Sequence, residues 1–417
     1  MKLKSVHKEN LISVKEVTEI IQNQTVNFGV EEVNFQESLH RVLKENVVAD
    51  RDFPPFNRVS MDGIAIKFNQ FQNGKRDFKI EGIQPAGSPQ LTLKNNENCI
   101  EVMTGATLPN NVDSVIPYEL VTIKNGIATI NLQEIKHFQN VHKKGKDRKK
   151  NDVILTENTL ISSADIGVLA TVGKYKVNVA KQPKVMIIST GDELVAVNEN
   201  PLDCQIRRSN VYTLISLLEN LNIKADNVHI SDDKEKLKTT ISKILNNYDV
   251  LLFSGAVSKG KFDFIPEVLN ELKVEKLFHR VSQRPGKPFW FGRIASSITD
   301  NLGTKKNTVV FAFPGNPVST YVSCLRYFQP WYKKSVGLDA TNKNFAILDQ
   351  DYTFKPNLTY FLQVKLTNKN GSIYATPLTG HGSGDLANLA DVDGFLEIPK
   401  GKDLFLKGAV FNYISFR

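Results

Sequence analysis

The sequence predicts a multidomain protein of the α/β plus β class, with a doubly wound, mostly parallel α/β domain. At roughly 150 residues per domain, the 417 residues suggest about three domains. Strand-like and helix-like segments alternate in one part of the chain, and short alternating runs bounded by Gly, Asn and Pro fill two others. The expected boundaries are 1–50 with 148–180 for a helical and extended linker domain, 51–147 for a β-rich domain, 181–335 for the α/β domain and 336–417 for a small C-terminal β domain.

Composition narrows the class of protein. Hydrophobic residues make up 41% and charged residues 23%, which is typical of a globular chain with buried cores. No apolar run approaches the roughly 18 residues of a membrane span, and the basic N-terminus lacks the apolar stretch of a signal peptide. Cys99, Cys204 and Cys324 are widely spaced and form no CxxC pair. We therefore expect a cytoplasmic protein without a membrane partner, and the net charge of +9 favours anionic ligands.

Helices are expected in the linker domain. Val14, Val17, Ile20 and Ile21 recur at helical spacing. The stretch FQESLHRVLKENVVADRDFPPF predicts a helix that runs into an extended Pro-Pro segment. LISSADIGVLATVG predicts a further helix, with Ser162 or Ser163 as its N-cap.

The α/β domain is predicted from alternating elements. Its expected strands are 185–189, 227–231, 250–254, 276–281 and 309–313. Helices at 209–223 and 233–247 each place leucines and isoleucines on one face. Alternation with helices of this length favours a largely parallel sheet.

Glycines, acids, bases and hydroxyls follow the predicted strands. They are TGDE at 190–193, SDD at 231–233, SGAVS and KGKFD at 254–263, QRPGKP at 283–288 and PGNP at 314–317. Ligands of open α/β sheets bind beyond the carboxyl ends of the strands. Mg²⁺ is usually held by one or two carboxylates plus substrate phosphates. The joint pattern predicts a site for Mg²⁺ and a phosphorylated ligand.

Each piece also has a structural interpretation. Asp192 and Glu193 suit the start of a helix, and Asp232 suits a helix N-cap. RPGKP can be a rigid turn with solvated charges, and Asn316 can cap a helix that starts at Pro317. Asp62-Gly63 can be a tight hairpin turn.

Seven stretches together resemble the motifs of the MoeA-type molybdopterin molybdenumtransferases, a family that includes the E domain of gephyrin. They are FPPFNRVSMDGIAI (53–66), EVMTGATLPNNVDSVIPYE (101–119), GKDRKKNDVIL (145–155), STGDEL (189–194), SGAVSKGKFDF (254–264), RPGKPFWFG (284–292) and FPGNPVS (313–319). They follow the family order and cover nearly the whole chain.

The resemblance implies a reaction. Family members take adenylylated molybdopterin and molybdate, insert molybdenum at the dithiolene and release AMP in a Mg²⁺-dependent step. They are elongated homodimers whose site lies between the α/β domain of one subunit and the SMDG-bearing domain of the other. The molybdopterin adenylyltransferase and apo-molybdoenzymes are further expected partners.

The resemblance also carries site residues over by motif. The catalytic acids are Asp62, Asp147, Glu193, Asp232 and Asp263, of which Glu193 and Asp263 would bind the metal. The cofactor-binding residues are Thr104, Thr190, Gly191, Ser254, Gly255, Ser258, Arg280, Arg284, Lys287, Pro314, Asn316 and Ser383. Asp62 and Asp147 are far from the other acids in sequence and would come from the partner subunit.

Some positions depart from the family pattern. Arg280 and Arg284 stand where the family commonly has Lys. Arginine stays protonated, so it can bind an oxyanion but cannot act as a base. Lys146 replaces an acid often seen before Asp147, and Arg58 adds charge before SMDG.

Two other functions stay open at this point. The first alternative is adenylylation of molybdopterin, the reaction of proteins with a related α/β domain. Those proteins lack the flanking domains, which speaks against this alternative. The chain can also be a non-catalytic molybdopterin-binding scaffold, since gephyrin relatives hold receptor tails. The basic run at 143–150 has no aromatic platform beside it, so we expect no nucleic-acid partner.

Overall fold

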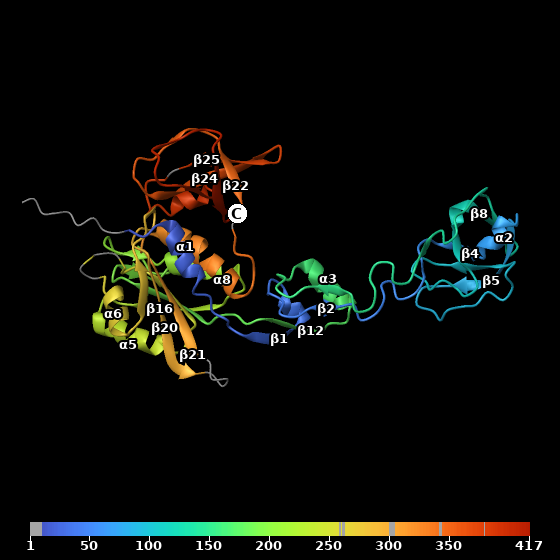
Figure 1. Cartoon of the computed structure of the whole chain (residues 1–417), viewed down its shortest axis with the longest axis horizontal. Coiled ribbons are helices and arrows are strands. Elements are labelled where there is room, and N and C mark those ends of the chain that lie inside the picture. Colours follow the sequence, from blue (N-terminus) through green and yellow to red (C-terminus); the bar gives the residue numbers. More distant parts are fainter. Residues whose placement is uncertain (1–10, 258–259, 261–262, 300–304, 342–343, 379) are drawn as a thin grey trace, which may run out of the picture. The chain divides into compact units, whose positions relative to one another are not determined.

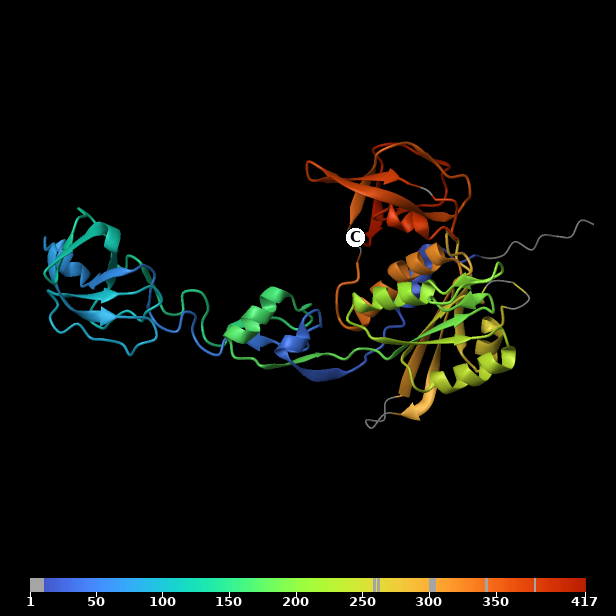
Figure 2. The same ribbon diagram turned by 180° about the vertical axis from the view of Figure 1, so that it is seen from behind.

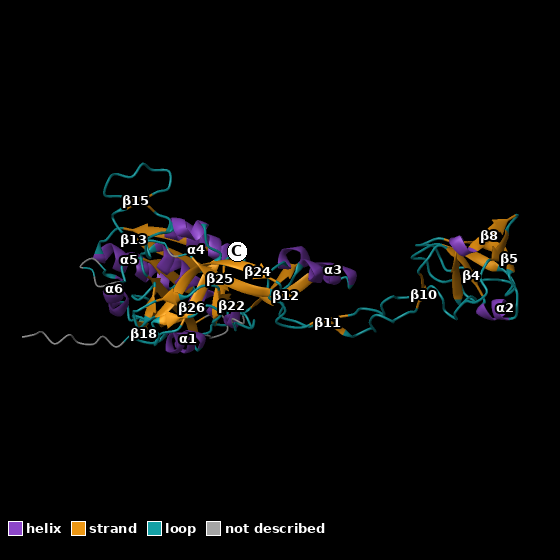
Figure 3. Cartoon of the chain, turned by 90° about the horizontal axis from the view of Figure 1, so that it is seen from above, coloured by secondary structure: helices purple, strands orange, loops and turns teal. Residues whose placement is uncertain are grey.

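The computed structural model describes residues 11–257, 260, 263–299, 305–341, 344–378 and 380–417, which form two compact units (Figure 1). Unit 1 holds the described residues of 1–31, 40–42 and 178–417, and unit 2 holds 32–39 and 43–177. Figure 2 shows the same ribbon from behind, and Figure 3 distinguishes helices from strands. Within the described ranges, none of the helices has the length and apolar character needed to cross a bilayer.

A six-stranded sheet forms the centre of unit 1. Its order is β16 (Ala225–Ile230), β13 (Val185–Thr190), β17 (Val250–Ser254), β21 (Lys305–Phe313), β20 (Trp290–Thr299) and β18 (Glu275–His279). β13 pairs in parallel with β16 and β17, and β17 with β21. β20 is antiparallel to both of its neighbours, so β18 again runs in the direction of the first four strands. The parallel pairing expected for this part of the chain is therefore present.

β20 is an addition to the strands predicted from sequence. It enters the sheet between β21 and β18, beside the aromatic residues of the core. Gly292 allows β18 to approach, because a Cβ there would lie 2.4 Å from the backbone oxygen of Glu275.

Helices cover both faces of this sheet. They are α4 (Asn210–Glu219), α5 (Lys234–Leu245), α6 (Ile265–Glu271), α7 (Pro317–Ser323), the π-helix η3 (Cys324–Phe328), α8 (Gln329–Ser335) and the N-terminal α1 (Val14–Gln22). Ile187 packs in one core with Leu214 of α4, whereas Ile188 packs in a second core with Leu237 of α5. Successive strand residues point to opposite faces, which explains this division. Each such buried side chain contributes roughly 1.5–3 kcal/mol.

A closed β-barrel follows in the C-terminal part of unit 1. Its strands are β22 (Phe345–Leu348), β24 (Thr359–Lys369), β25 (Ser372–Pro377), β26 (Gly394–Ile398) and β28 (Val410–Ser415), accompanied by β19 (Gln283–Arg284), β23 (Tyr352–Thr353), β27 (Leu404–Phe405) and η4 (Ala387–Ala390). The ring runs β24-β25-β22-β28-β26, and pairing of β26 with β24 closes it. Closure removes the free sheet edges. A short pair, β14 (Leu194–Val195) with β15 (Ile206–Arg207), completes the unit.

Unit 2 contains a second six-stranded sheet. Its order is β7 (Ser114–Pro117), β4 (Gly63–Ile66), β6 (Cys99–Val102), β5 (Asp77–Gln84), β9 (Ile127–Ile130) and β8 (Val121–Lys124), with α2 (Phe68–Gln72) and η2 (Tyr118–Leu120) beside it. The remaining short elements of the chain are β1 (Val30–Asn34), η1 (Phe35–Ser38), β2 (Val47–Val48), β3 (Arg58–Val59), β10 (Val141–His142), β11 (Val153–Leu155), α3 (Ser163–Thr171) and β12 (Lys176–Ala180), of which β1 and β12 are only partly counted in unit 2.

The linker region confirms one predicted helix and corrects another. Ser162 caps α3 and forms a capping box with Asp165, as the pattern predicted. The long helix expected from Phe35 onward is wrong, because only the 3₁₀ turn η1 forms there. The backbone of Leu43 instead bonds to residues 158 and 159, so tertiary pairing overrides the local helical pattern.

Candidate functional site

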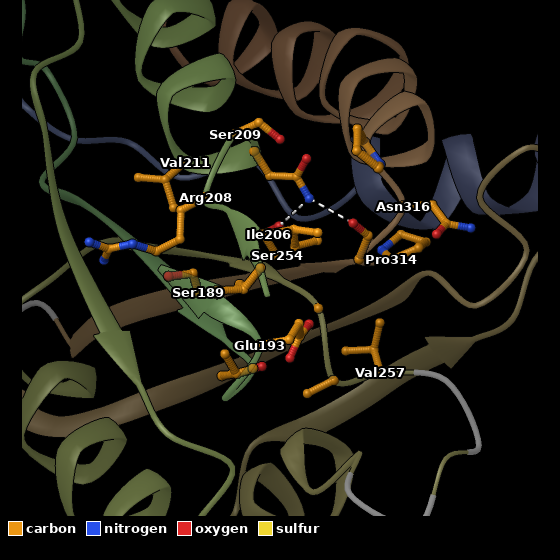
Figure 4. Close-up of a pocket in the computed structure, with 18 of the residues that line it drawn as sticks. Ser189, Glu193, Ile206, Arg208, Ser209, Val211, Ser254, Val257, Pro314 and Asn316 are labelled. Carbon is orange, nitrogen blue, oxygen red and sulfur yellow. Dashed lines mark hydrogen bonds between the residues drawn. The ribbon is translucent and has the colours of Figure 1, made fainter. Parts of the chain in front are cut away.

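A cavity of about 550 Å³ lies at the carboxyl ends of the parallel strands of unit 1 (Figure 4). The acids Glu193, Asp232 and Asp263 line it. Other residues predicted from the sequence also line it, namely Thr190, Gly191, Ser254, Gly255, Pro314 and Asn316. The strand ends thus bring together segments that are far apart in the sequence, as expected for an open α/β sheet.

The acids of this cavity influence one another. Burial of Asp232 raises the pKa of its carboxyl group, a backbone hydrogen bond with Asp192 lowers it, and the negative charges of Asp192, Glu193 and Asp263 raise it further. Asp192 also accepts a hydrogen bond from the backbone N–H of Asp232 at 3.2 Å. Carboxylates that repel one another around a cavity make the cavity attractive to a cation.

This donor set fits Mg²⁺. Mg²⁺ prefers carboxylate oxygens and commonly completes its coordination with substrate phosphates. In the part of the chain that the structure describes, no group of three or more His, Cys, Asp and Glu side chains is arranged to hold a metal ion alone. Coordination by Glu193 and Asp263 would therefore leave positions for water and for oxygens of a phosphorylated ligand.

Several glycines form part of the cavity wall. Gly191 has a φ of 135°, and a Cβ there would lie 2.5 Å from Oε2 of Glu193. Gly315 approaches Gly255, since its Cβ would lie 3.4 Å from the Cα of Gly255. The backbone N–H of Gly255 donates to the carbonyl of Phe313 at 3.2 Å. The backbone N–H of Gly255 is therefore already used within the sheet, while Gly255 itself lines the cavity.

Two hydroxyl groups of the first cavity, those of Thr190 and Ser254, can still donate a hydrogen bond to a ligand. Oγ1 of Thr190 is buried and has no hydrogen-bond partner. Oγ of Ser254 accepts a hydrogen bond from Asn210 at 2.8 Å. Ser258, also predicted for this loop, lies outside the described residues.

The basic residues lie in a second cavity of about 570 Å³. Arg284, Lys287 and Ser383 line it, and it shares Asn316 with the first cavity. Nδ2 of Asn316 donates to Oγ of Ser383 at 2.7 Å, which brings the barrel region to the edge of the sheet. Arg280 is not among the residues that line either of these two cavities. Sequence reasoning grouped all these residues in one site, whereas the structure separates the acids from Arg284 and Lys287.

A separate group forms in unit 2. Asp62 accepts hydrogen bonds from the backbone N–H of Thr104 at 2.6 Å and from its hydroxyl at 2.7 Å. These bonds, the side-chain one first, lower the pKa of Asp62. Asp147 lies 2.8 Å from Nε2 of His142. The structure thus pairs Asp62 with Thr104 and Asp147 with His142.

Two structural interpretations of these motifs are wrong, and a third is confirmed in part. Asp62 does not turn a hairpin, because β3 pairs with β10 rather than with the following β4. Asp233, not Asp232, caps α5 by accepting from the N–H of Lys236. The helix start at Pro317 is confirmed, with Asn316 at the N-cap position of α7, but the side chain of Asn316 makes no capping bond and its amide donates to Ser383 instead.

Sequence reasoning missed several cavity residues. Arg207, Arg208 and Asn210 line the first cavity, and His229 lies 3.0 Å from the hydroxyl of Ser189. Burial, followed by the charge of Arg208, lowers the pKa of His229. The polar run RRSN directly before the apolar face of α4 was the available signal.

Comparisons with known proteins agree with this architecture. The chain matches the MoeA N-terminal region (domain I and II) over 12–173, a probable molybdopterin binding domain over 186–334 and the MoeA C-terminal region (domain IV) over 346–416.

Full-length relatives extend the match. A protein from Synechocystis named molybdopterin molybdenumtransferase is 41% identical over 97% of this chain and 100% of its own length. One of that name from Staphylococcus epidermidis is 30% identical over 98% of this chain and 97% of its own. The crystal structure of the molybdopterin biosynthesis moeA protein from Pyrococcus horikoshii OT3 is 26% identical, covers 97% of this chain and 100% of its own, and has a TM-score of 0.79. The chain therefore belongs to the MoeA family.

Proposed function

We propose that the chain is a molybdopterin molybdenumtransferase that inserts molybdenum from molybdate into adenylylated molybdopterin and releases AMP in a Mg²⁺-dependent step. The names of the full-length relatives support the reaction class. The observation that carries the proposal is the convergence of Glu193, Asp232 and Asp263 on one cavity at the strand ends.

The acids of the first cavity would hold Mg²⁺. Bound there with a phosphorylated ligand, the ion would neutralise phosphate charge and polarise the bond to be broken. Glu193 and Asp263 are the proposed ligands, and Asp232 adds negative charge beside them. The hydroxyls of Thr190 and Ser254 line the same cavity and can donate to phosphate oxygens.

The second cavity suits an oxyanion. Arg284 offers a planar fork of donors, Lys287 a compact positive charge and Ser383 a hydroxyl. Molybdate or the pterin phosphate is the proposed ligand. Because Asn316 lines both cavities, an anion bound in the second would lie next to a nucleotide bound in the first.

The proposal also includes the wider setting. The enzyme would act in the cytoplasm as a homodimer. Asp62 and Asp147 would reach the cavity from the partner subunit and position the dithiolene end of the substrate or an attacking water. The molybdopterin adenylyltransferase would supply its substrate, and apo-molybdoenzymes would receive the product. The four-domain division at 1–50 with 148–180, 51–147, 181–335 and 336–417 remains part of this proposal.

The test is AMP release by the purified protein from adenylylated molybdopterin, with and without molybdate and Mg²⁺. We expect release that needs both, with molybdenum retained in the product. Glu193→Gln should lower kcat/KM by about 100-fold, since it removes a charged ligand from the reacting centre. Glu219→Gln is the matched control, because Glu219 is an exposed carboxylate at the end of α4.

Other outcomes would support the other functions. Turnover that requires ATP and unmodified molybdopterin would indicate adenylylation. Tight binding without AMP release under any of these conditions would indicate a scaffold, and Glu193→Gln would then leave the chain's role unchanged.

A further inference from the structure

One side chain of the first cavity joins three separate segments of unit 1. Nδ2 of Asn210 donates to Oγ of Ser254 at 2.8 Å and to the backbone oxygen of Gly315 at 2.7 Å. It also lies 3.4 Å from Oγ1 of Thr320. Figure 4 marks hydrogen bonds within this pocket by dashed lines. Asn210 therefore connects the start of α4 with the end of β17 and with the loop that follows β21.

The loop after β21 depends on this connection. Its backbone oxygen at Pro314 accepts a second bond, from the hydroxyl of Thr320 at 2.6 Å. The next residue, Asn316, reaches Ser383 through its side chain. Asn210 and Thr320 thus hold the segment that lines both cavities.

Asn210 also determines where the proton of Ser254 points. A hydroxyl group has one hydrogen to donate and two lone pairs. Because Ser254 accepts from Asn210, its own hydrogen must point elsewhere, and Ser254 is a buried residue that lines the cavity. The structure assigns no protein acceptor to that hydrogen among the described residues. An oxygen inside the cavity, from a ligand or a water molecule, can accept it.

Helix formation does not account for Asn210. It is the first residue of α4, and the N-cap before it, Ser209, makes no side-chain capping bond. The amide of Asn210 donates to oxygens of segments outside α4. Its hydrogen bonds therefore serve the cavity wall.

We propose that Asn210 is a positioning residue for the reaction: it directs the hydroxyl of Ser254 toward an oxyanion of the substrate and fixes the 314–316 loop against β17. The inference rests on the proposed function for the identity of that substrate. Its geometric part, the placement of the two segments, can be measured without any turnover.

Substitutions at Asn210 separate hydrogen bonding from packing. Asn210→Asp keeps the shape of the side chain but places a carboxylate oxygen opposite the carbonyl of Gly315. This oxygen would also accept the hydrogen of the Ser254 hydroxyl, which would then point away from the cavity. Asn210→Ala removes the donor without adding a repulsive oxygen. If donation matters, Asp is at least as harmful as Ala; if only volume matters, Asp resembles the unchanged protein. Asn220→Asp is the matched control, since Asn220 is an exposed asparagine at the other end of α4.

The first readout is amide hydrogen exchange of segments 254–257 and 313–317 in the full chain. We expect roughly tenfold faster exchange in Asn210→Ala and Asn210→Asp, the factor that a hydrogen bond worth about 1.4 kcal/mol represents. The Asn220→Asp protein should exchange as the unchanged protein does. Unchanged exchange in both Asn210 variants would overturn the inference, whatever happens to activity.

The second readout is kcat/KM for AMP release in a double-mutant cycle with Ser254→Ala. Each single variant should lose up to about 100-fold, the effect of a misplaced contact of about 1 Å. If Asn210 acts through Ser254, Asn210→Ala combined with Ser254→Ala should be little worse than the worse single variant. Fully additive losses, or a harmless Asn210→Asp, would overturn the inference.

The two readouts keep this inference apart from the proposed function. A chain that releases no AMP under any condition refutes the function. The exchange of the two segments still decides whether Asn210 positions them.

Discussion

Gly191→Ala tests how the cavity positions its principal acid. Gly191 has a φ of 135°, in a region that L-residues rarely adopt. Its added Cβ would lie 2.5 Å and 2.7 Å from the two carboxylate oxygens of Glu193. Ordinary contact begins at 3.4 Å, so the flexible carboxylate must retreat by about 1 Å. The backbone strain should cost about 1–3 kcal/mol of unfolding free energy.

The matched control is Gly401→Ala in the same unit. Gly401 has a φ of 102° and no heavy atom within 4 Å of its added Cβ, so this variant carries the strain alone. Both tryptophans, Trp290 and Trp331, are buried in unit 1, and their fluorescence during urea unfolding therefore reports on that unit. We expect similar stability losses in the two variants.

Activity should distinguish them. A misplacement of about 1 Å at a reacting group can cost about 100-fold in rate, so Gly191→Ala should lose about that much in kcat/KM for AMP release. Gly401→Ala should remain close to the unchanged protein. Equal activities of the two variants, at equal loss of stability, would refute the view that Gly191 holds Glu193 in its working position.

Three further predictions concern unit 2 and the metal. Gly63→Ala should lower the unfolding free energy of unit 2 by about 1–3 kcal/mol or more, because its Cβ would lie 1.9 Å from the backbone oxygen of Ile116. The control Gly82→Ala should change this free energy little, because its Cβ meets only a side-chain atom, at 3.8 Å. Urea unfolding followed by circular dichroism compares the two variants. Thr104→Val should raise the pKa of Asp62 toward its usual value, because it removes the hydrogen bond that lowers this pKa most; an NMR titration that finds no change would contradict the assignment. Chelation of Mg²⁺ should abolish AMP release and re-addition should restore it, whereas full activity in excess chelator would argue against metal coordination by the acids.

Much of the α/β sheet could be predicted because its signals are local. The apolar strands at 185–190 and 250–254 and the apolar faces of α4 and α5 are visible in short windows. Parallel strands share one carboxyl edge, so the topology alone placed Glu193, Asp232 and Asp263 at a common cavity. The capping box at Ser162 is equally local.

Local sequence patterns did not predict the elements whose conformation depends on packing against residues far away in the sequence. The helical pattern after Phe35 was overridden by backbone pairing with residues more than a hundred positions away. β20 was missed because its place depends on β18 and β21 on either side of it. Closure of the C-terminal barrel rests on the pairing of β24 with β26, which no local pattern indicates.

The sequence by itself determined the family resemblance, the parallel sheet and the chemical types at its ligand edge, because motifs and strand ends are properties of short segments. The tertiary structure alone decided how the other polar and basic groups are arranged around the acids. It separated Arg284 and Lys287 from the acids, tied Asn316 to Ser383 and placed Asn210 between two loops. The last two arrangements rest on single hydrogen bonds between residues 44 to 105 positions apart, and such bonds produce no periodic pattern in the sequence.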